Sequence, residues 1–171
     1  MAPGKAVLVT RPAGRASEGL CRALAQAGYQ SVSQPLLELR PVAPLPPPER
    51  AIIQALDSYR HVIFISANAV AFGMVEIDRY WPQLPVGLNW YGIGEATAAE
   101  LAGWDINAIT PGEEMTSEGL LSVPQLRRVA GERVLIVKGL GGRGKLRDEL
   151  AARGAEVDLL PCYERCCPAL P

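Results

Sequence analysis

The amino-acid sequence predicts an α/β fold, built as two similar domains whose parallel sheets are flanked by helices. Two observations lead to this prediction. Predicted strands alternate with predicted helices along the 171 residues, which is typical of parallel sheets covered on both faces. In addition, a pattern of strand, basic residue, glycine loop, helix, glycine and strand occurs twice. Each copy describes a βαβ unit, so the repeat indicates a duplicated architecture.

The two copies of the repeat keep nearly the same spacing. Arg11 and Lys138 follow the first strand of each copy, and Gly28 and Gly154 end the helices. The offset is 127 residues at the basic position and 126 at the glycine. The loops between strand and helix therefore differ in length by one residue.

The N-terminal region, residues 1–40, supplies the first copy. The β-branched run at 7–10 predicts a buried strand, Ser17 is a candidate cap for the helix that Gly28 ends, and residues 31–39 predict a second strand. Two strands and one helix cannot bury both faces of a sheet. We therefore expect the first domain to be incomplete in this chain, as in a C-terminally truncated form of a two-domain parent.

A proline-rich segment marks the expected domain boundary. Residues 41–48 contain five prolines, which predicts a stiff, extended linker. We expect residues 49–165 to form the second domain and residues 166–171 to begin a return linker.

The second domain is expected to be a complete five-stranded α/β domain. Its predicted strands are residues 61–66, 90–93 and 106–110 and the two strands of the second βαβ copy. Its predicted helices are residues 49–57, 68–80, 95–102 and 117–129, the last with a break expected at Pro124, followed by the helix of the second copy.

The composition excludes several classes of protein. The chain is 49% apolar and 20% charged with a net charge of −1, which is ordinary for a globular protein and less basic than a nucleic-acid binder. No apolar run approaches the ~20 residues of a membrane span, and the N-terminus has no signal-peptide pattern. We expect a cytoplasmic protein without nucleic-acid or membrane partners. The four cysteines contain no CxxC pair, so we expect free thiols and no metal site.

Four loops lie where parallel sheets bind ligands, at the carboxyl ends of predicted strands. They are residues 11–15, 66–68, 92–97 and 138–143. Each precedes a predicted helix, whose free amides and partial positive charge suit a carboxylate or a phosphate. The loops also hold hydroxyl and basic side chains and glycines that let the backbone approach a ligand. These candidates include Arg11, Ser66, Gly94, Thr97, Lys138, Gly141 and Arg143.

Each candidate also has a structural interpretation. Ser66 and Thr97 could serve only as helix caps, the glycines only as tight turns, and Arg11 and Lys138 only as solvated charges. The single histidine, His61, opens a strand rather than facing a partner base, which favours a structural role. The loops lack the spacing of dinucleotide and Walker phosphate motifs. The residues alone therefore predict an anionic ligand held between two α/β domains, without a metal or a cofactor.

Six motifs occur in order over nearly the whole chain. They are VLVTRP (7–12), LAQAGYQSVSQPLLEL (24–39), FISANAV (64–70), GIGEATAAEL (92–101), TSEGLL (116–121) and VLIVKGLGGRGKLRDELAARGAEVDLLPCYER (134–165). Together, with their spacing, they resemble the uroporphyrinogen-III synthase family. The resemblance implies two similar α/β domains linked by two extended strands. It also implies that the first domain is built from both chain ends and that the family's final segment is absent here.

The resemblance implies a lyase that needs no cofactor. The family closes hydroxymethylbilane, a linear tetrapyrrole with eight carboxylates, into uroporphyrinogen III with inversion of the last ring and loss of water. Since spontaneous closure gives the uninverted isomer I, catalysis consists mostly of holding the substrate folded. The implied protein is a cytoplasmic monomer of tetrapyrrole and heme biosynthesis. We expect this form, which lacks half of the cleft wall, to be weak or inactive.

The resemblance also assigns residues. It places Tyr163 in the cleft as the catalytic residue, a hydrogen-bond donor or general acid that helps the hydroxyl leave. Lys138 departs from the arginine common in the family, which argues against a bidentate carboxylate clamp there. The residues that match substrate-binding positions are Arg11, Ser66, Asn68, Gly94, Thr97, Lys138, Gly141 and Arg143.

Two other interpretations stay open. A non-catalytic α/β module that binds an anionic small molecule between its domains would carry the same loops. An interaction fragment would also fit, because the incomplete first unit would expose strand edges and one sheet face to another chain.

Overall fold

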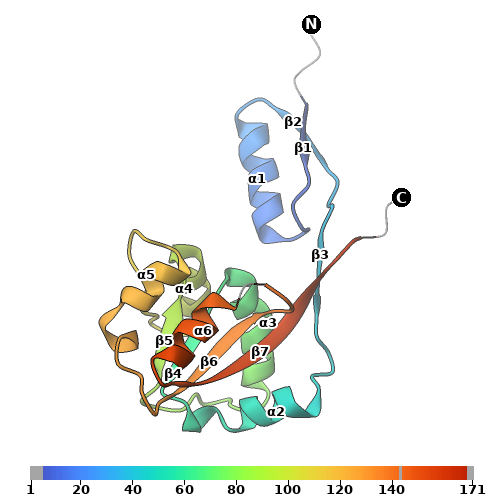
Figure 1. Ribbon diagram of the computed structural model, residues 1–171. Helices are drawn as coiled ribbons and strands as arrows, with labels where there is room; N and C mark the ends of the chain where they lie inside the picture. The colour runs from blue at the N-terminus through green and yellow to red at the C-terminus, as the bar shows by residue number, and fades with distance from the viewer. Residues whose placement is uncertain (1–5, 143, 169–171) are drawn as a thin grey trace, which may run out of the picture. The chain divides into compact units, whose positions relative to one another are not determined.

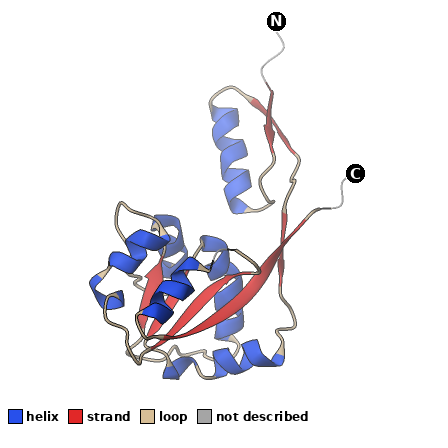
Figure 2. Cartoon of the chain, viewed as in Figure 1, coloured by secondary structure: helices blue, strands red, loops and turns tan. Residues whose placement is uncertain are grey.

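The computed structural model describes residues 6–142 and 144–168, and the chain divides into two compact units. Unit 1 comprises Met1–Arg40 and Arg165–Pro171, and unit 2 comprises Pro41–Glu164. Figure 1 labels their helices and strands, and Figure 2 colours them by type. Both units join parallel strands through helices, so the predicted α/β class is confirmed.

Unit 1 contains one βαβ unit. β1 (Ala6–Val9) pairs in parallel with β2 (Gln30–Ser33), and α1 (Arg15–Gln26) connects them. Leu8 lies opposite Val32 in this register, and the two residues are 61% and 55% exposed. These neighbours therefore form an apolar surface that is open to solvent.

The expected start of α1 is wrong, and its expected end is confirmed. Gly14, with a φ of 132°, precedes the helix, and Ser17 lies buried in the first turn instead of at the cap. A positive φ favours glycine, so the chain turns into the helix at Gly14, before it reaches Ser17. Gly28 has a φ of 82°, and its amide and the next one donate to helix carbonyls at 3.0 and 2.9 Å, as in a Schellman motif.

Two expected boundaries beside the proline-rich segment are wrong. Residues 31–39 do not form one strand: β2 ends at Ser33 and β3 (Glu38–Pro41) follows after an irregular segment that contains Pro35. The expected linker 41–48 is also too long. Two of its prolines open α2 (Pro47–Gln54), since the fixed φ of proline suits a first helical turn.

The larger sheet has the strand order β3-β7-β6-β4-β5, and β7, β6, β4 and β5 pair in parallel. Its further strands are β4 (His61–Phe64), β5 (Asn89–Gly92), β6 (Arg133–Gly139) and β7 (Glu156–Cys166). The helices after α2 are η1 (Leu56–Ser58), α3 (Ala67–Asp78), α4 (Glu95–Ala102), α5 (Ser117–Ser122), η2 (Pro124–Leu126) and α6 (Lys145–Ala152). β6, α6 and β7 repeat the βαβ arrangement of unit 1, so the sequence repeat is also a structural one.

One strand predicted for this sheet is absent from the described residues. Residues 106–110 make a single bridge, in which the amide of Ile109 donates to Trp90 and its carbonyl accepts from Gly92. Pro111 has no amide to extend this pairing. The fifth strand is β3 instead. The break expected at Pro124 is confirmed, because α5 ends before it and η2 begins at it.

Helices cover both faces of this sheet, with α6 in front of it and α3 behind it in Figure 1. Leucines of α5 and α6 pack with Val134 and Ile136 in one buried cluster. On the other face, α3 approaches β6 so closely that a Cβ on Gly73 would lie 2.5 Å from Val137 Cγ1. Successive residues of β6 thus point to opposite faces. In the described part of the chain, no helix is both long and apolar enough to cross a membrane.

Candidate functional site

Three helices of unit 2 begin at one edge of its sheet. α3, α4 and α6 follow β4, β5 and β6, and these strands are parallel neighbours in the order β6-β4-β5. Their carboxyl ends therefore meet along one edge, which we call the carboxyl edge and define by residues 65–68, 92–97 and 138–142. Free amides and the partial positive charge of three helix N-termini lie along it.

Ser66 and Tyr163 meet at the carboxyl edge. Ser66 Oγ lies 3.3 Å from Tyr163 Oη, and it accepts a hydrogen bond of 3.0 Å from the amide of Ala69. Ser66 is therefore the N-cap of α3, as its structural interpretation predicts. It is also the neighbour of the phenol that the family resemblance assigns to catalysis.

Tyr163 is packed on several sides. Its ring stacks on the ring of Phe72 with the centroids 5.4 Å apart, and a Cβ on Gly139 would lie 2.7 Å from Tyr163 Cζ. The residue is 1% exposed. These contacts order the phenol before any ligand binds.

The other predicted residues in the loops after β4 and β5 differ in exposure. Asn68 is exposed in the first turn of α3. Gly94 precedes α4 as its N-cap residue, and a Cβ there would lie 3.0 Å from the sulfur of Met115. Thr97 is 3% exposed and shares the buried side of α4 with Leu101. Asn68 is therefore more exposed to solvent than Thr97.

The carboxyl end of β6 carries the cation of this edge: Lys138 lies within the strand, so the expectation that it follows the strand is wrong. Lys138 is half-buried, and its Nζ lies 3.9 Å from the position of a Cβ on Gly142, so the ammonium lies close to the glycine loop. Gly141 is exposed with a φ of 74°. Lys145 is paired with the carboxylate of Glu118, and this hydrogen bond holds the pKa of Glu118 below its ordinary value.

Two predicted basic residues are not part of the carboxyl edge as defined above. Arg11 follows β1 in unit 1 and is exposed, and Arg143 lies outside the described residues. The structure therefore brings together Ser66, Tyr163 and the loops after β4, β5 and β6.

The amino-terminal edge of the same sheet carries a polar cluster that sequence reasoning missed. His61 opens β4 and is 2% exposed; its Nε2 lies 2.7 Å from Glu132 Oε2 and its Nδ1 lies 2.8 Å from Tyr91 Oη. The expectation that His61 faces no partner base is wrong, because the carboxylate of Glu132 lies beside its ring, although its burial agrees with a structural role. Burial and the Glu132 carboxylate raise the pKa of Tyr91. Among the described residues, no group of three or more His, Cys, Asp and Glu side chains could hold a metal ion.

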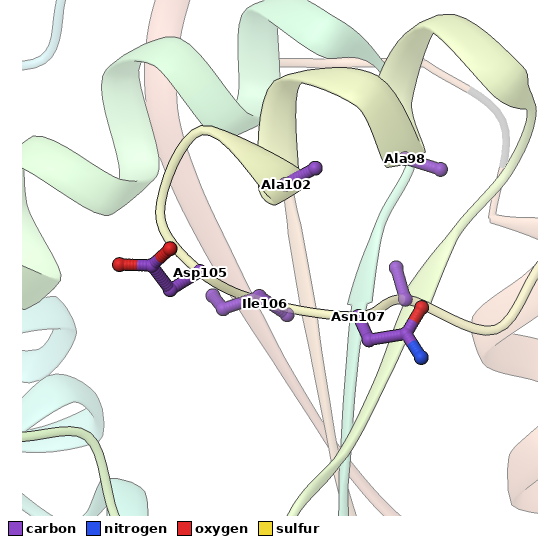
Figure 3. Close-up of a pocket in the computed structure, with 6 residues that line it drawn as sticks. Ala98, Ala102, Asp105, Ile106 and Asn107 are labelled. Atoms are coloured by element: carbon purple, nitrogen blue, oxygen red, sulfur yellow. The ribbon is translucent and has the colours of Figure 1, made fainter.

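A shallow hollow of about 270 Å³ lies beside α4 (Figure 3). Its lining residues are Ala98, Ala102, Asp105, Ile106, Asn107 and Ala108. The carboxylate of Asp105 and the amide of Asn107 lie at its border in Figure 3. None of these residues is a predicted site residue.

The fold and the carboxyl edge define an α/β protein of the kind that binds ligands where parallel strands end. The family model described as uroporphyrinogen-III synthase HemD matches residues 18–170. The chain belongs to the uroporphyrinogen-III synthase family.

Named relatives agree with this assignment. The chain is 39% identical over 166 residues to uroporphyrinogen-III synthase of Escherichia coli, covering 94% of this chain and 65% of that relative. It is 34% identical over 160 residues to the synthase of Proteus mirabilis, covering 93% of this chain and 79% of that relative. This chain therefore spans about two thirds of the length of the Escherichia coli protein.

Solved structures show the same fold. A crystal structure of a mutant uroporphyrinogen III synthase from the extremely thermophilic bacterium Thermus thermophilus matches with a TM-score of 0.62 at 17% identity, over 95% of this chain and 63% of that one. A second Thermus thermophilus structure, of uroporphyrinogen III synthase, matches with a TM-score of 0.52 at 19% identity, over 95% of this chain and 64% of that one. At these identities the likeness shows the fold alone.

Proposed function

We propose that the protein acts as a uroporphyrinogen-III synthase, which closes hydroxymethylbilane to uroporphyrinogen III with inversion of the last pyrrole ring and loss of water. The observation that carries the proposal is the family match over residues 18–170, because this range contains the whole carboxyl edge. The relative at 39% identity bears the same enzyme name. The reaction belongs to tetrapyrrole and heme biosynthesis.

The geometry of the carboxyl edge supports this proposal. Three helix N-termini and Lys138 offer amides and positive charge, which suit the carboxylates of a linear tetrapyrrole. Tyr163 Oη, ordered beside Ser66, supplies a hydrogen-bond donor or acid for the hydroxyl that leaves as water. The substrate-binding residues of the proposal are Arg11, Ser66, Asn68, Gly94, Thr97, Lys138, Gly141 and Arg143.

The catalytic task in this proposal is mainly conformational. Spontaneous closure of the linear substrate gives isomer I, so the enzyme must hold the last ring where the inverting attack occurs first. Several carboxylate contacts spread along one rigid sheet edge would restrict the substrate in this way. The proposal includes two similar domains joined by two extended strands, in a cytoplasmic monomer.

Product isomer analysis tests the proposal. Because the chain spans 65% of the Escherichia coli relative, two proteins are compared: the 171 residues alone, and the same residues followed by the final segment of that relative. Each is incubated with fresh hydroxymethylbilane, and isomers I and III are separated after oxidation. We expect isomer III above the no-enzyme control from the fusion and weak or no turnover from the chain alone. Isomer I alone from both folded proteins contradicts the proposal.

A further inference from the structure

We infer that Gly139 is a positioning residue for Tyr163, at a β-bulge that turns the phenol toward the N-terminus of α3. The inference rests on the proposed function, because it concerns the residue proposed to act on the leaving hydroxyl. It adds a requirement that the side chains of the site do not reveal: one position of the neighbouring strand must have no side chain.

The register between β6 and β7 changes beside Gly139. Lys138 lies opposite Pro161, and the next residue, Gly139, lies opposite Tyr163. β7 therefore carries one extra residue, Cys162, between two consecutive pairs. Such a bulge redirects the side chains that follow it, and bulges are frequent beside active sites.

The contacts of β7 show the redirection. Leu159 packs with the buried cluster of α5 and α6, whereas the Sγ of Cys162 lies 3.6 Å from the carbonyl oxygen of Ala69 in α3. In a regular strand the residue after Cys162 would point back to the α6 face. Instead, the ring of Tyr163 stacks on Phe72 of α3. Two consecutive residues thus face α3, and the second one reaches Ser66.

Gly139 leaves the space that this orientation needs. A Cβ on it would lie 2.7 Å from Cζ and 2.8 Å from Cε2 of the Tyr163 ring, closer than carbon atoms approach without displacement. Gly139 is not among the glycines with positive φ, so space rather than backbone conformation requires glycine here. The ring of Tyr163 is also stacked on Phe72 and is almost fully buried, which leaves little room for the ring to move aside. A side chain at this position must therefore shift the phenol from its place beside Ser66.

A thermal unfolding cycle on the full chain tests the contact without reference to activity. We expect Gly139→Ala to lower the Tm of the wild type, but not that of Tyr163→Ala, because the added methyl group then occupies vacated space. Gly19→Ala is the matched control: Gly19 lies in α1 with nothing within 4 Å of its Cβ position, and alanine is the better helix former. We expect its Tm to stay or rise. An equal loss of Tm from Gly139→Ala in both backgrounds overturns the inference.

Turnover tests the positioning role, measured on whichever of the two proteins above makes isomer III. We expect Gly139→Ala to lower kcat on the order of 100-fold, since a misplacement of about 1 Å can cost that much, while KM changes less than about twofold. In the Tyr163→Phe background the same substitution should cost little more, because the hydroxyl to be positioned is gone. A Gly139→Ala variant with the kcat of wild type contradicts the inference. A wild type that yields isomer I alone contradicts the proposed function. In that case the unfolding cycle still tests the contact between Gly139 and the ring of Tyr163.

Discussion

Ser66→Ala separates the structural role of Ser66 from its proposed role at the site. The hydroxyl caps α3 through a 3.0 Å bond from the amide of Ala69, and removing such a cap costs about 1 kcal/mol. Its 3.3 Å separation from Tyr163 Oη exceeds the usual O–H···O range of about 2.5–3.0 Å, so this contact adds little to stability. We expect Ser66→Ala to lose about 1 kcal/mol of unfolding free energy in urea.

Thr116→Ala provides the matched control for this experiment. Thr116 Oγ1 caps α5 by accepting a bond of the same 3.0 Å length from the amide of Gly119. Both variants should lose similar unfolding free energy, while turnover to isomer III falls only in Ser66→Ala. The reasoning is refuted if Ser66→Ala loses less than about 0.3 kcal/mol, below the usual range for a cap. An equal fall of turnover in Thr116→Ala refutes it as well.

Three further predictions concern buried polar groups and are measured by urea unfolding. Burial raises the pKa of the Cys162 thiol from 9.0 to about 12, so the unfolded chain loses this proton first and stability falls as the pH rises between these values. The advantage of wild type over Cys162→Ala should shrink by about 1.4 kcal/mol from pH 7 to pH 10; an unchanged difference contradicts this. Arg153 donates bonds of 2.7 and 2.8 Å to carbonyls of α5 and η2, so Arg153→Met should lose about 2 kcal/mol, and wild-type stability in that variant would argue against the role. His61→Phe leaves the hydroxyl of Tyr91 and the carboxylate of Glu132 without their ring partner and should lose about 2 kcal/mol or more, whereas a variant as stable as wild type would show that the cluster contributes nothing.

The local parts of the fold could be read from the sequence. The expected helix at residues 95–102 matches α4 residue for residue, since glycines stand on both sides of it. Helix breaks at Pro124 and Gly28 also followed from the chemistry of single residues. Which segments pair in the sheet did not follow, because pairing depends on contacts distant in sequence. Residues 106–110 are as apolar as a strand, yet β3 supplies the fifth strand.

The candidate site likewise has features that the sequence predicted and features that it did not. Ser66 and Tyr163 are 97 residues apart, and the sequence places each of them at the end of a strand, where a parallel sheet brings them to one edge. The bulge opposite Gly139 and the stacking on Phe72 could not be predicted, because a one-residue change of register has no local signal. The partners of His61 were missed for the same reason: Tyr91 and Glu132 approach it only once the sheet has formed.

The isomer ratio made by Tyr163→Phe, beside its binding of substrate, tests the central claim most directly. The claim is that the hydroxyl of Tyr163, held at the carboxyl edge, acts in the ring closure. We predict that the fusion with the Escherichia coli segment makes isomer III and that Tyr163→Phe in the same protein binds hydroxymethylbilane with similar affinity but makes little isomer III. Isomer III from Tyr163→Phe at the wild-type rate would contradict the claim.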